Sequence, residues 1–153
     1  MTFFDYPSGA QQSGAAEQLR PFLPHASERE WSELLRLATV RRLAPGETLI
    51  SPGPGSRSLF LVIEGQVEVL APANRKWRHV ATIGAGSVVG ELAFFDGGER
   101  SALVRALTDV SASELTHESF GALRRTNPEL AMALVLDVGR VLSQRMRLAQ
   151  AAI

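Results

Sequence analysis

The sequence contains no cysteine, few aromatic residues and no excess of charge of either sign. Without cysteine, neither a disulfide framework nor a thiolate-ligated metal site is possible. Lysine and arginine together number 16, as do aspartate and glutamate, so no net field attracts nucleic acid or an anionic membrane. The lack of cysteine is also consistent with a reducing compartment.

Long apolar runs are missing as well. No stretch approaches the roughly 18 apolar residues that a membrane-spanning helix needs. The N-terminus lacks a basic segment followed by an apolar one, so it does not resemble a secretory signal. We therefore expect a soluble, cytoplasmic protein that does not associate with a membrane. Residues 1–18 are expected to form a flexible lead-in, because residues 8–16 are rich in serine, glycine, glutamine and alanine. Residues 19–153 are expected to form a single domain.

Residue patterns for metal binding and catalysis are also lacking. The histidines His25, His79 and His117 are scattered along the chain and show no metal-ligand spacing. Ser101 has no neighbouring base in the sequence that would activate its hydroxyl. We expect no metal, no prosthetic group and no enzymatic activity.

The patterns that are present begin with a helix signal. Ser27-Glu28-Arg29-Glu30 is a capping box, in which Ser27 and Glu30 can each satisfy a backbone amide of the other. Apolar residues follow at helical spacing and form one stripe. These residues are Trp31, Leu34, Leu35 and Ala38.

Between Val40 and Leu115 the chain consists of short β-type runs separated by turns that contain glycine or proline. In one of them, Val67 and Val69 alternate with Gln66 and Glu68, as in a half-buried strand. Short, regularly spaced strands predict a closed jelly roll rather than an open sheet. The predicted strands are Thr48–Ser51, Ser58–Glu64, Gln66–Ala71, Trp77–Ile83, Ser101–Ala106 and Val110–Leu115.

Two helices are predicted at the end of the chain. Thr116 is a candidate N-cap for a helix over His117–Thr126. Asn127-Pro128-Glu129 then starts a second helix, which is expected to end near Ala149. The predicted fold class is therefore mainly β with flanking helices: a double-stranded β-helix (jelly roll) with an N-terminal helix and a long C-terminal helix.

The last helix carries two apolar stripes. Leu134, Val138, Val141 and Leu148 form one stripe, and the other consists of Val135, Leu142, Met146 and Ala149. A helix with one wide buried face would explain both stripes. The favoured alternative places one stripe on the β-domain and the other on the same helix of a second copy, which predicts a homodimer.

The segment from Gly86 to Ala102 contains the residues best suited to bind an anion. A strand that ends in glycine and turns into a short helix presents free amides. Arg100 offers a fork of donors that suits phosphate, and Ser101 adds a hydroxyl, while ionised Glu91 accepts hydrogen bonds and suits a sugar hydroxyl. These residues predict a nucleotide site. The alternative is an ion pair between Glu91 and Arg100 in a loop that binds no ligand.

The stretch GELAFFDGGERSALVRA resembles the phosphate-binding cassette of cyclic nucleotide-binding domains, in particular that of bacterial catabolite activator (cyclic AMP receptor) proteins. LFLVIEGQVEVL and NPELAMALVLDVGRVL are similar to strands and to the long helix of that family. The resemblance covers about residues 27–149. It implies a regulatory module that binds cyclic AMP, or else cyclic GMP, and signals through its C-terminal helix.

The resemblance also implies roles for individual residues. Glu91 would bind the ribose 2′-hydroxyl and Arg100 the cyclic phosphate, with help from Ser101 and from the backbone around Gly90 and Ala102. The apolar wall around the sugar and base would consist of Val80, Ile83 and Leu92.

Arg145 lies where the catabolite activators have a threonine that contacts the base. Arginine can reach guanine N7 and O6, stack on either purine or point to solvent, so cyclic AMP is favoured only weakly over cyclic GMP, and a cyclic dinucleotide is a third alternative. In that family a helix-turn-helix domain follows the long helix, whereas this sequence ends at Ile153. We therefore expect no DNA-binding domain, unless the sequence is part of a longer protein, and a signal passed through the homodimer or to a separate effector protein. A dimerisation or interaction module that binds no ligand remains the second hypothesis.

Overall fold

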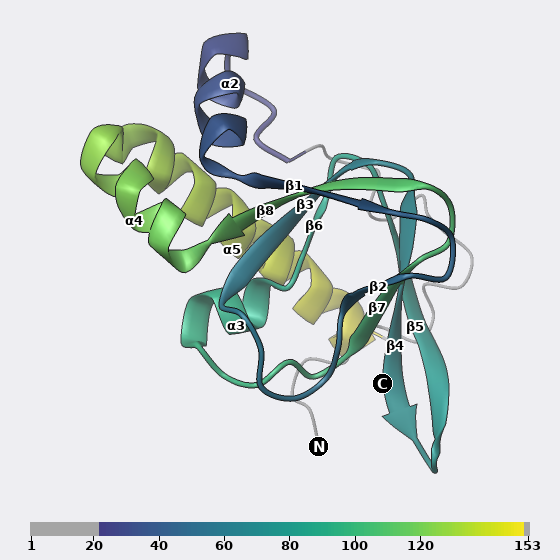
Figure 1. The fold of residues 1–153 in the computed structure, drawn as a ribbon. Helices are drawn as coiled ribbons and strands as arrows, with labels where there is room; N and C mark the ends of the chain where they lie inside the picture. The colour runs from purple at the N-terminus through teal and green to yellow at the C-terminus, as the bar shows by residue number, and fades with distance from the viewer. Residues whose placement is uncertain (1–21, 152–153) are drawn as a thin grey trace.

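The structure, a computed structural model, describes residues 22–151, so the lead-in predicted over residues 1–18 lies outside the described residues. Within this range the strands form two antiparallel sheets, and helices pack at one side of them (Figure 1). The strands are β1 (Thr39–Leu43), β2 (Thr48–Ile50), β3 (Ser58–Glu64), β4 (Gln66–Ala73), β5 (Lys76–Gly84), β6 (Val88–Val89), β7 (Leu103–Ala106) and β8 (Val110–Thr116). The helices are α2 (Glu28–Leu37), α3 (Glu91–Asp96), α4 (His117–Thr126) and α5 (Pro128–Ala151).

The sheet topology confirms the predicted jelly roll. One sheet has the order β1-β8-β3-β6 and the other the order β2-β7-β4-β5, so each sheet combines strands that are distant in the sequence. The long β4–β5 hairpin extends away from the body of the roll (Figure 1). The predicted strand over Ser101–Ala106 begins only at Leu103, because the preceding residues belong to the loop that follows α3.

The predicted helix starts are confirmed by their hydrogen bonds. The Glu30 amide donates to Ser27 Oγ at 3.1 Å, and the Ser27 amide donates to Glu30 Oε1 at 3.1 Å, which completes the capping box. Thr116 Oγ1 caps α4 by accepting from the Ser119 amide at 3.0 Å. Asn127 Oδ1 accepts from the Leu130 amide at 3.1 Å at the start of α5. Four side chains therefore fix where three helices begin.

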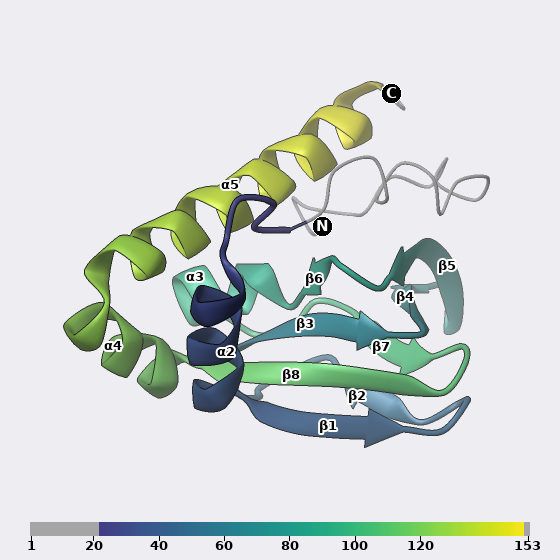
Figure 2. The ribbon, with the colours of Figure 1, turned by 90° about the horizontal axis from the view of Figure 1, so that it is seen from above.

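The apolar core has two parts. One fills the space between the two sheets, and the other lies between the first sheet and the helices. Helix α5 contributes Leu134, Val138 and Val141 to the second part, and it lies across the roll near α3 and β6 (Figure 2). These three residues belong to the first predicted stripe, while Leu148 of the same stripe is 40% exposed. The stripe thus packs on the protein's own β-domain until the last turns of the helix.

The sequence pattern is misleading at Glu68. Its alternation with Val67 and Val69 predicts a side chain facing solvent, yet Glu68 is buried. On the outer face of its sheet Glu68 forms an ion pair with Arg105 and a hydrogen bond, at 3.3 Å, with His79. The strand therefore has one face in the core and one face that carries paired polar side chains.

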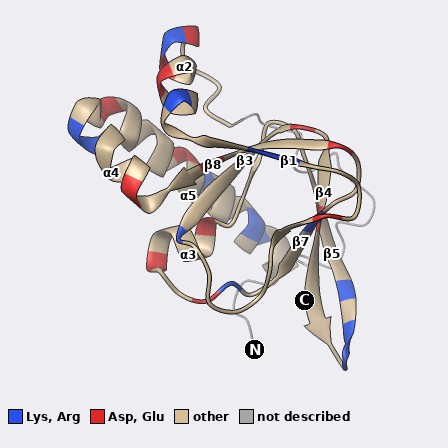
Figure 3. Cartoon of the chain, in the orientation of Figure 1, with Lys and Arg blue, Asp and Glu red and all other residues tan. Residues whose placement is uncertain are grey.

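Acidic and basic residues are interspersed along the ribbon (Figure 3). None of the helices in residues 22–151 combines the length and the hydrophobicity that crossing a membrane requires. In the same range, no group of three or more histidine, cysteine, aspartate or glutamate side chains is placed to hold a metal ion.

Candidate functional site

The candidate site begins where β6 ends. Gly90 follows Val89 with φ 82°, a left-handed conformation that favours glycine, and α3 starts at the next residue. Glu91 is therefore the first residue of a helix of six residues, and the residue is only 2% exposed. This confirms the predicted sequence of strand, glycine and short helix. It also places a carboxylate inside the protein.

The chain after α3 returns Arg100 to Gly90. Gly53 and Arg100 form an isolated bridge, in which the Gly53 amide donates to the Arg100 carbonyl at 2.9 Å and the Arg100 amide donates back at 2.8 Å. This bridge fixes the Arg100 backbone against the loop between β2 and β3. The Arg100 side chain is 7% exposed.

The Arg100 guanidinium contacts three backbone carbonyls. Nη1 donates to Gly90 O at 2.9 Å, and Nη2 donates to Ser56 O at 2.6 Å and to Ser58 O at 2.7 Å. The guanidinium carbon also lies 5.8 Å from the centroid of the Phe60 ring. The side chain therefore joins the start of β3 to the turn before α3.

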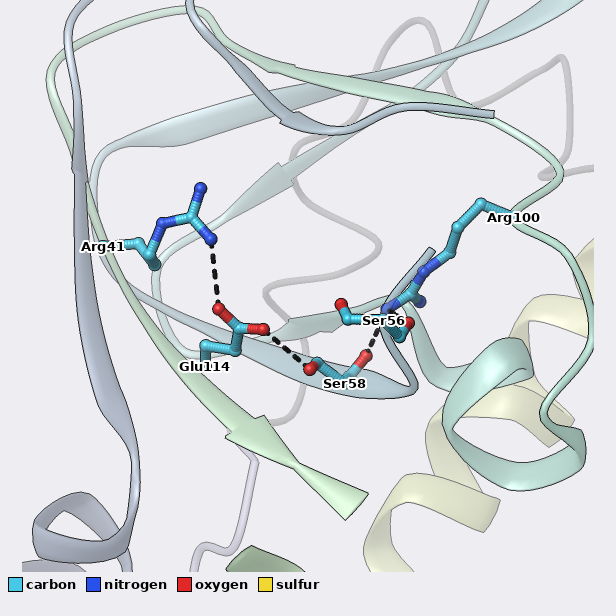
Figure 4. A network of polar contacts seen from close by, with 5 residues as sticks. All are labelled: Arg41, Ser56, Ser58, Arg100 and Glu114. Carbon is cyan, nitrogen blue, oxygen red and sulfur yellow. Dashed lines mark hydrogen bonds and ion pairs between the residues drawn. The ribbon is translucent and has the colours of Figure 1, made fainter. Parts of the chain in front are cut away.

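Ser58 connects Arg100 to the ion pair between Arg41 and Glu114 (Figure 4). Its hydroxyl donates to Glu114 Oε2 at 2.7 Å, and Glu114 Oε1 accepts from Arg41 Nη1 at 3.0 Å. Ser58 is completely buried, whereas the Arg41 side chain is 43% exposed. A continuous polar network thus runs from Arg100 in the interior to the surface at β1.

Glu91 forms its ion pair with the last helix. Arg145 Nη1 lies 2.9 Å from Glu91 Oε1, and the two side chains are 5% and 3% exposed. Arg145 Nη2 also donates to Val88 O at 2.7 Å and lies 3.5 Å from Ser87 Oγ. Proximity in the sequence had suggested Arg100 as the partner of Glu91. In the structure the cationic partner of Glu91 is Arg145 of α5, which is 54 positions away in the sequence.

A cavity of about 30 Å³ lies between the cassette and the second sheet. Six of the predicted site residues line it together, namely Gly90, Glu91, Leu92, Arg100, Ser101 and Ala102. The space is partly open to solvent, and its enclosed part has room for about one water molecule.

Five further residues line the cavity and were not among the predicted site residues, namely Ile50, Val69, Ala93, Glu99 and Val104. Of these, Ala93, Glu99 and Val104 could have been suspected, because they lie within the cassette stretch GELAFFDGGERSALVRA. Ile50 and Val69 reach the cavity through the pairing of β2 and β4 with β7, which no local pattern reveals.

Three predicted site residues lie elsewhere in the described structure. Val80 and Ile83, on β5, are 1% and 0% exposed, and Ile83 belongs to the core between the sheets. Arg145 contacts Glu91 but is not among the described residues that line the cavity. The contacts predicted between these three residues and a ligand therefore remain predictions.

Comparison with known proteins relates the chain to one family. The model of the cyclic nucleotide-binding domain matches residues 40–127, which is more than half of the chain. This match includes the cavity residues from Ile50 to Val104, whereas Arg145 lies beyond it.

Two relatives show how such a domain occurs in larger proteins. Glutaminase 2 of Bradyrhizobium diazoefficiens is 32% identical over 81% of this chain, and the cAMP-activated global transcriptional regulator CRP of Escherichia coli O6:H1 is 31% identical over 72%. The chain spans only 19% and 53% of these two proteins. Among solved structures, the catabolite activator protein of Thermus thermophilus has a TM-score of 0.74 at 27% identity, covering 86% of this chain and 61% of that one.

Proposed function

Because the chain belongs to the cyclic nucleotide-binding domain family, we propose that it binds a purine cyclic mononucleotide, cyclic AMP in the first instance, and reports occupancy through α5. The observation that carries this proposal is the convergence of Glu91, Arg100 and Ser101 on one cavity beside the first turn of α3. They supply a sugar-hydroxyl acceptor and two phosphate donors.

In this proposal the cyclic phosphate binds to the Arg100 fork, the Ser101 hydroxyl and the backbone of Gly90 and Ala102. The ribose 2′-hydroxyl donates to Glu91. Leu92 lines the same cavity and would contact the sugar, and the predicted apolar wall includes Val80 and Ile83 farther along the roll.

The energetics require more than the phosphate contact. A hydrogen bond to a charged group contributes about 1.5–3 kcal/mol, whereas micromolar affinity requires about 8 kcal/mol. In addition, Arg100 must exchange at least part of its contacts with the carbonyls of Gly90, Ser56 and Ser58 for contacts with the phosphate. Burial of the base must therefore supply much of the binding energy.

Calorimetric titration with cyclic AMP and with cyclic GMP tests this proposal. We expect wild-type protein to bind one of them with submillimolar affinity, and Arg100→Ala to weaken that binding by about 10-fold to 150-fold. Arg42→Ala, at an exposed position of β1, is the matched control and should bind like wild type. Arg100→Lys keeps the positive charge but loses the two parallel N–H donors of the guanidinium, so it should give an intermediate affinity.

Circular dichroism and thermal unfolding establish that each variant is folded. No binding of either nucleotide to folded wild-type protein would refute the proposal. Displacement of the mononucleotide by a cyclic dinucleotide at lower concentration would instead favour the larger ligand.

Exposed apolar side chains on α5 support a homodimer, but only one of them, Met146, belongs to the second predicted stripe. The other members of that stripe, Val135, Leu142 and Ala149, are half-buried. Met132, Leu136 and Met146 are 60%, 67% and 39% exposed, although they are large apolar side chains. Met132, Gly139 and Met146 repeat every seven residues, which is the spacing of a seam between two parallel helices. Apart from the nearby backbone of α5 itself, no atom of residues 22–151 lies within 4 Å of the position where a Cβ would be at Gly139, so a second helix can approach closely there. We propose that a second copy of this chain covers these exposed side chains.

Light scattering coupled to size exclusion tests the dimer. Wild type should have the mass of two chains, and Leu136→Glu should have the mass of one, because the seam would bury an unpaired charge. Leu107→Glu is the control, since Leu107 is 40% exposed on the loop after β7. A wild-type monomer at high concentration would refute the homodimer. A dimer that binds no nucleotide would favour the interaction module that acts without a ligand.

A further inference from the structure

The ion pair between Arg145 and Glu91 assigns a role to the last helix inside the site. We infer that Arg145 is a positioning residue, which holds the Glu91 carboxylate in the orientation that recognises a ribose 2′-hydroxyl. The selectivity of the site for ribose over 2′-deoxyribose is then set partly by α5. This inference rests on the proposed function, because it concerns how the same site selects its sugar.

The geometry places Glu91 between the cavity and Arg145. Glu91 lines the cavity, and on α5 its Oε1 meets Arg145 Nη1 at 2.9 Å. Arg145 itself is not among the described residues that line the cavity. Arg145 can therefore act on a ligand in the cavity through Glu91.

The position of the guanidinium is determined by the β-roll as well as by α5. Arg145 Nη2 donates to Val88 O at 2.7 Å, and Val88 is fully buried in β6, two residues before Gly90. The guanidinium is therefore held by the strand that leads into the cassette. Because the Arg145 guanidinium binds both the Val88 carbonyl and the Glu91 carboxylate, it restricts the orientation of the carboxylate more than an isolated ion pair would.

The chemistry of the pair is suited to recognise a hydroxyl donor. An ionised carboxylate accepts only, and its two oxygens offer about four lone-pair positions, so a contact with Arg145 leaves acceptor capacity for a sugar hydroxyl. Burial of both side chains makes the pair sensitive to the loss of one partner, because the other is then a buried charge without its counter-ion. Glu91 without Arg145 would be drawn away from the orientation that faces the cavity.

Coupling between two sites is reciprocal. If the pair strengthens binding of a ribose hydroxyl, then that hydroxyl strengthens the attachment of the last turns of α5 to the roll. The presence of the 2′-hydroxyl on the ligand would thus determine how firmly the last turns of α5 are attached to the roll.

The test compares affinities for cyclic AMP and for 2′-deoxy cyclic AMP in four proteins: wild type, Arg145→Gln, Arg145→Lys and Arg147→Gln. Arg147 is exposed on the same helix and is the matched control. We expect wild type and Arg147→Gln to prefer the ribonucleotide by about tenfold or more, the value of one hydrogen bond to a charged group. In Arg145→Gln this ratio should fall to about twofold or less, and Arg145→Lys should lie between the two because it restores the charge but not the fork.

A change in the ratio separates positioning from a purely structural role, since general destabilisation lowers both affinities equally. The double variant Glu91→Gln/Arg145→Gln should show the same ratio as Glu91→Gln alone, because Arg145 acts through Glu91. An unchanged ratio in both folded Arg145 variants, or a tighter ribonucleotide complex in Arg145→Gln, would overturn this inference alone. No binding of cyclic AMP or cyclic GMP to wild type would overturn the proposed function, and this inference with it.

Discussion

Replacing Gly90 by alanine should damage stability and ligand binding through two separable effects. Gly90 has φ 82°, and the left-handed conformation costs a residue with a Cβ about 1–2 kcal/mol. A Cβ at this position would also lie 2.7 Å from Arg100 Nη1. The guanidinium must therefore move away from Gly90 O, and the 2.9 Å hydrogen bond between them, worth about 1.5–3 kcal/mol, is lost.

Gly46→Ala isolates the backbone effect. Gly46 has φ 88°, and apart from its two chain neighbours no atom of the described residues lies within 4 Å of the position of a Cβ, so this variant should lose only about 1–2 kcal/mol of unfolding free energy. Gly90→Ala should lose about 1.5–3 kcal/mol more than Gly46→Ala, the value of the Arg100 hydrogen bond. Urea unfolding followed by circular dichroism measures both losses, with unchanged m-values as the check on two-state behaviour.

Calorimetric titration of the same two variants tests the link to function. Gly46→Ala should bind cyclic nucleotide like wild type, whereas Gly90→Ala should bind more weakly, because Arg100 is displaced in the folded protein. Equal losses of stability in the two variants would refute the argument that Gly90 is required for the approach of Arg100.

Two further variants test the packing and the polar network. Leu134→Ala removes a fully buried side chain of α5 and should lower the unfolding free energy by about 2–5 kcal/mol in a urea titration; a loss below 1 kcal/mol would contradict the docking of α5 on the roll. Ser58→Ala removes the hydroxyl that donates to Glu114 and should cost about 1–3 kcal/mol in the same assay. It should leave nucleotide affinity within about twofold, because the Ser58 carbonyl still accepts from Arg100; a loss of affinity above tenfold would show that the hydroxyl itself supports the site.

Local signals in the sequence predicted the starts of the helices well. Ser27, Thr116 and Asn127 cap helices through hydrogen bonds to residues three positions away, so the pattern and the contact lie in the same short segment. The same holds for the turn at Gly90, because a glycine between a strand and a short helix is itself the reason for the left-handed conformation.

Contacts between distant segments were less predictable. The sequence offered only Arg100 as a partner for Glu91, since the two are nine positions apart in an apolar run. The structure pairs Glu91 with Arg145, and this contact depends on how α5 docks across β6. Glu68 shows the same limit: its position on the outer face follows from alternation, but its contacts with Arg105 of β7 and His79 of β5 do not.

Helix α5 is attached to the rest of the domain at two points besides its apolar stripe. The Leu23 amide donates to Asp137 Oδ2 at 2.6 Å, and Arg145 pairs with Glu91 eight residues later. Eight residues correspond to about 12 Å of helix. A small rotation of α5 about Asp137 would therefore displace Arg145. A tilt of about 5° about that point would move Arg145 by about 1 Å over this length, enough to stretch the 2.9 Å contact with Glu91 beyond hydrogen-bonding distance. The attachment that a ribose hydroxyl would strengthen is thus one that a small tilt of α5 is enough to break.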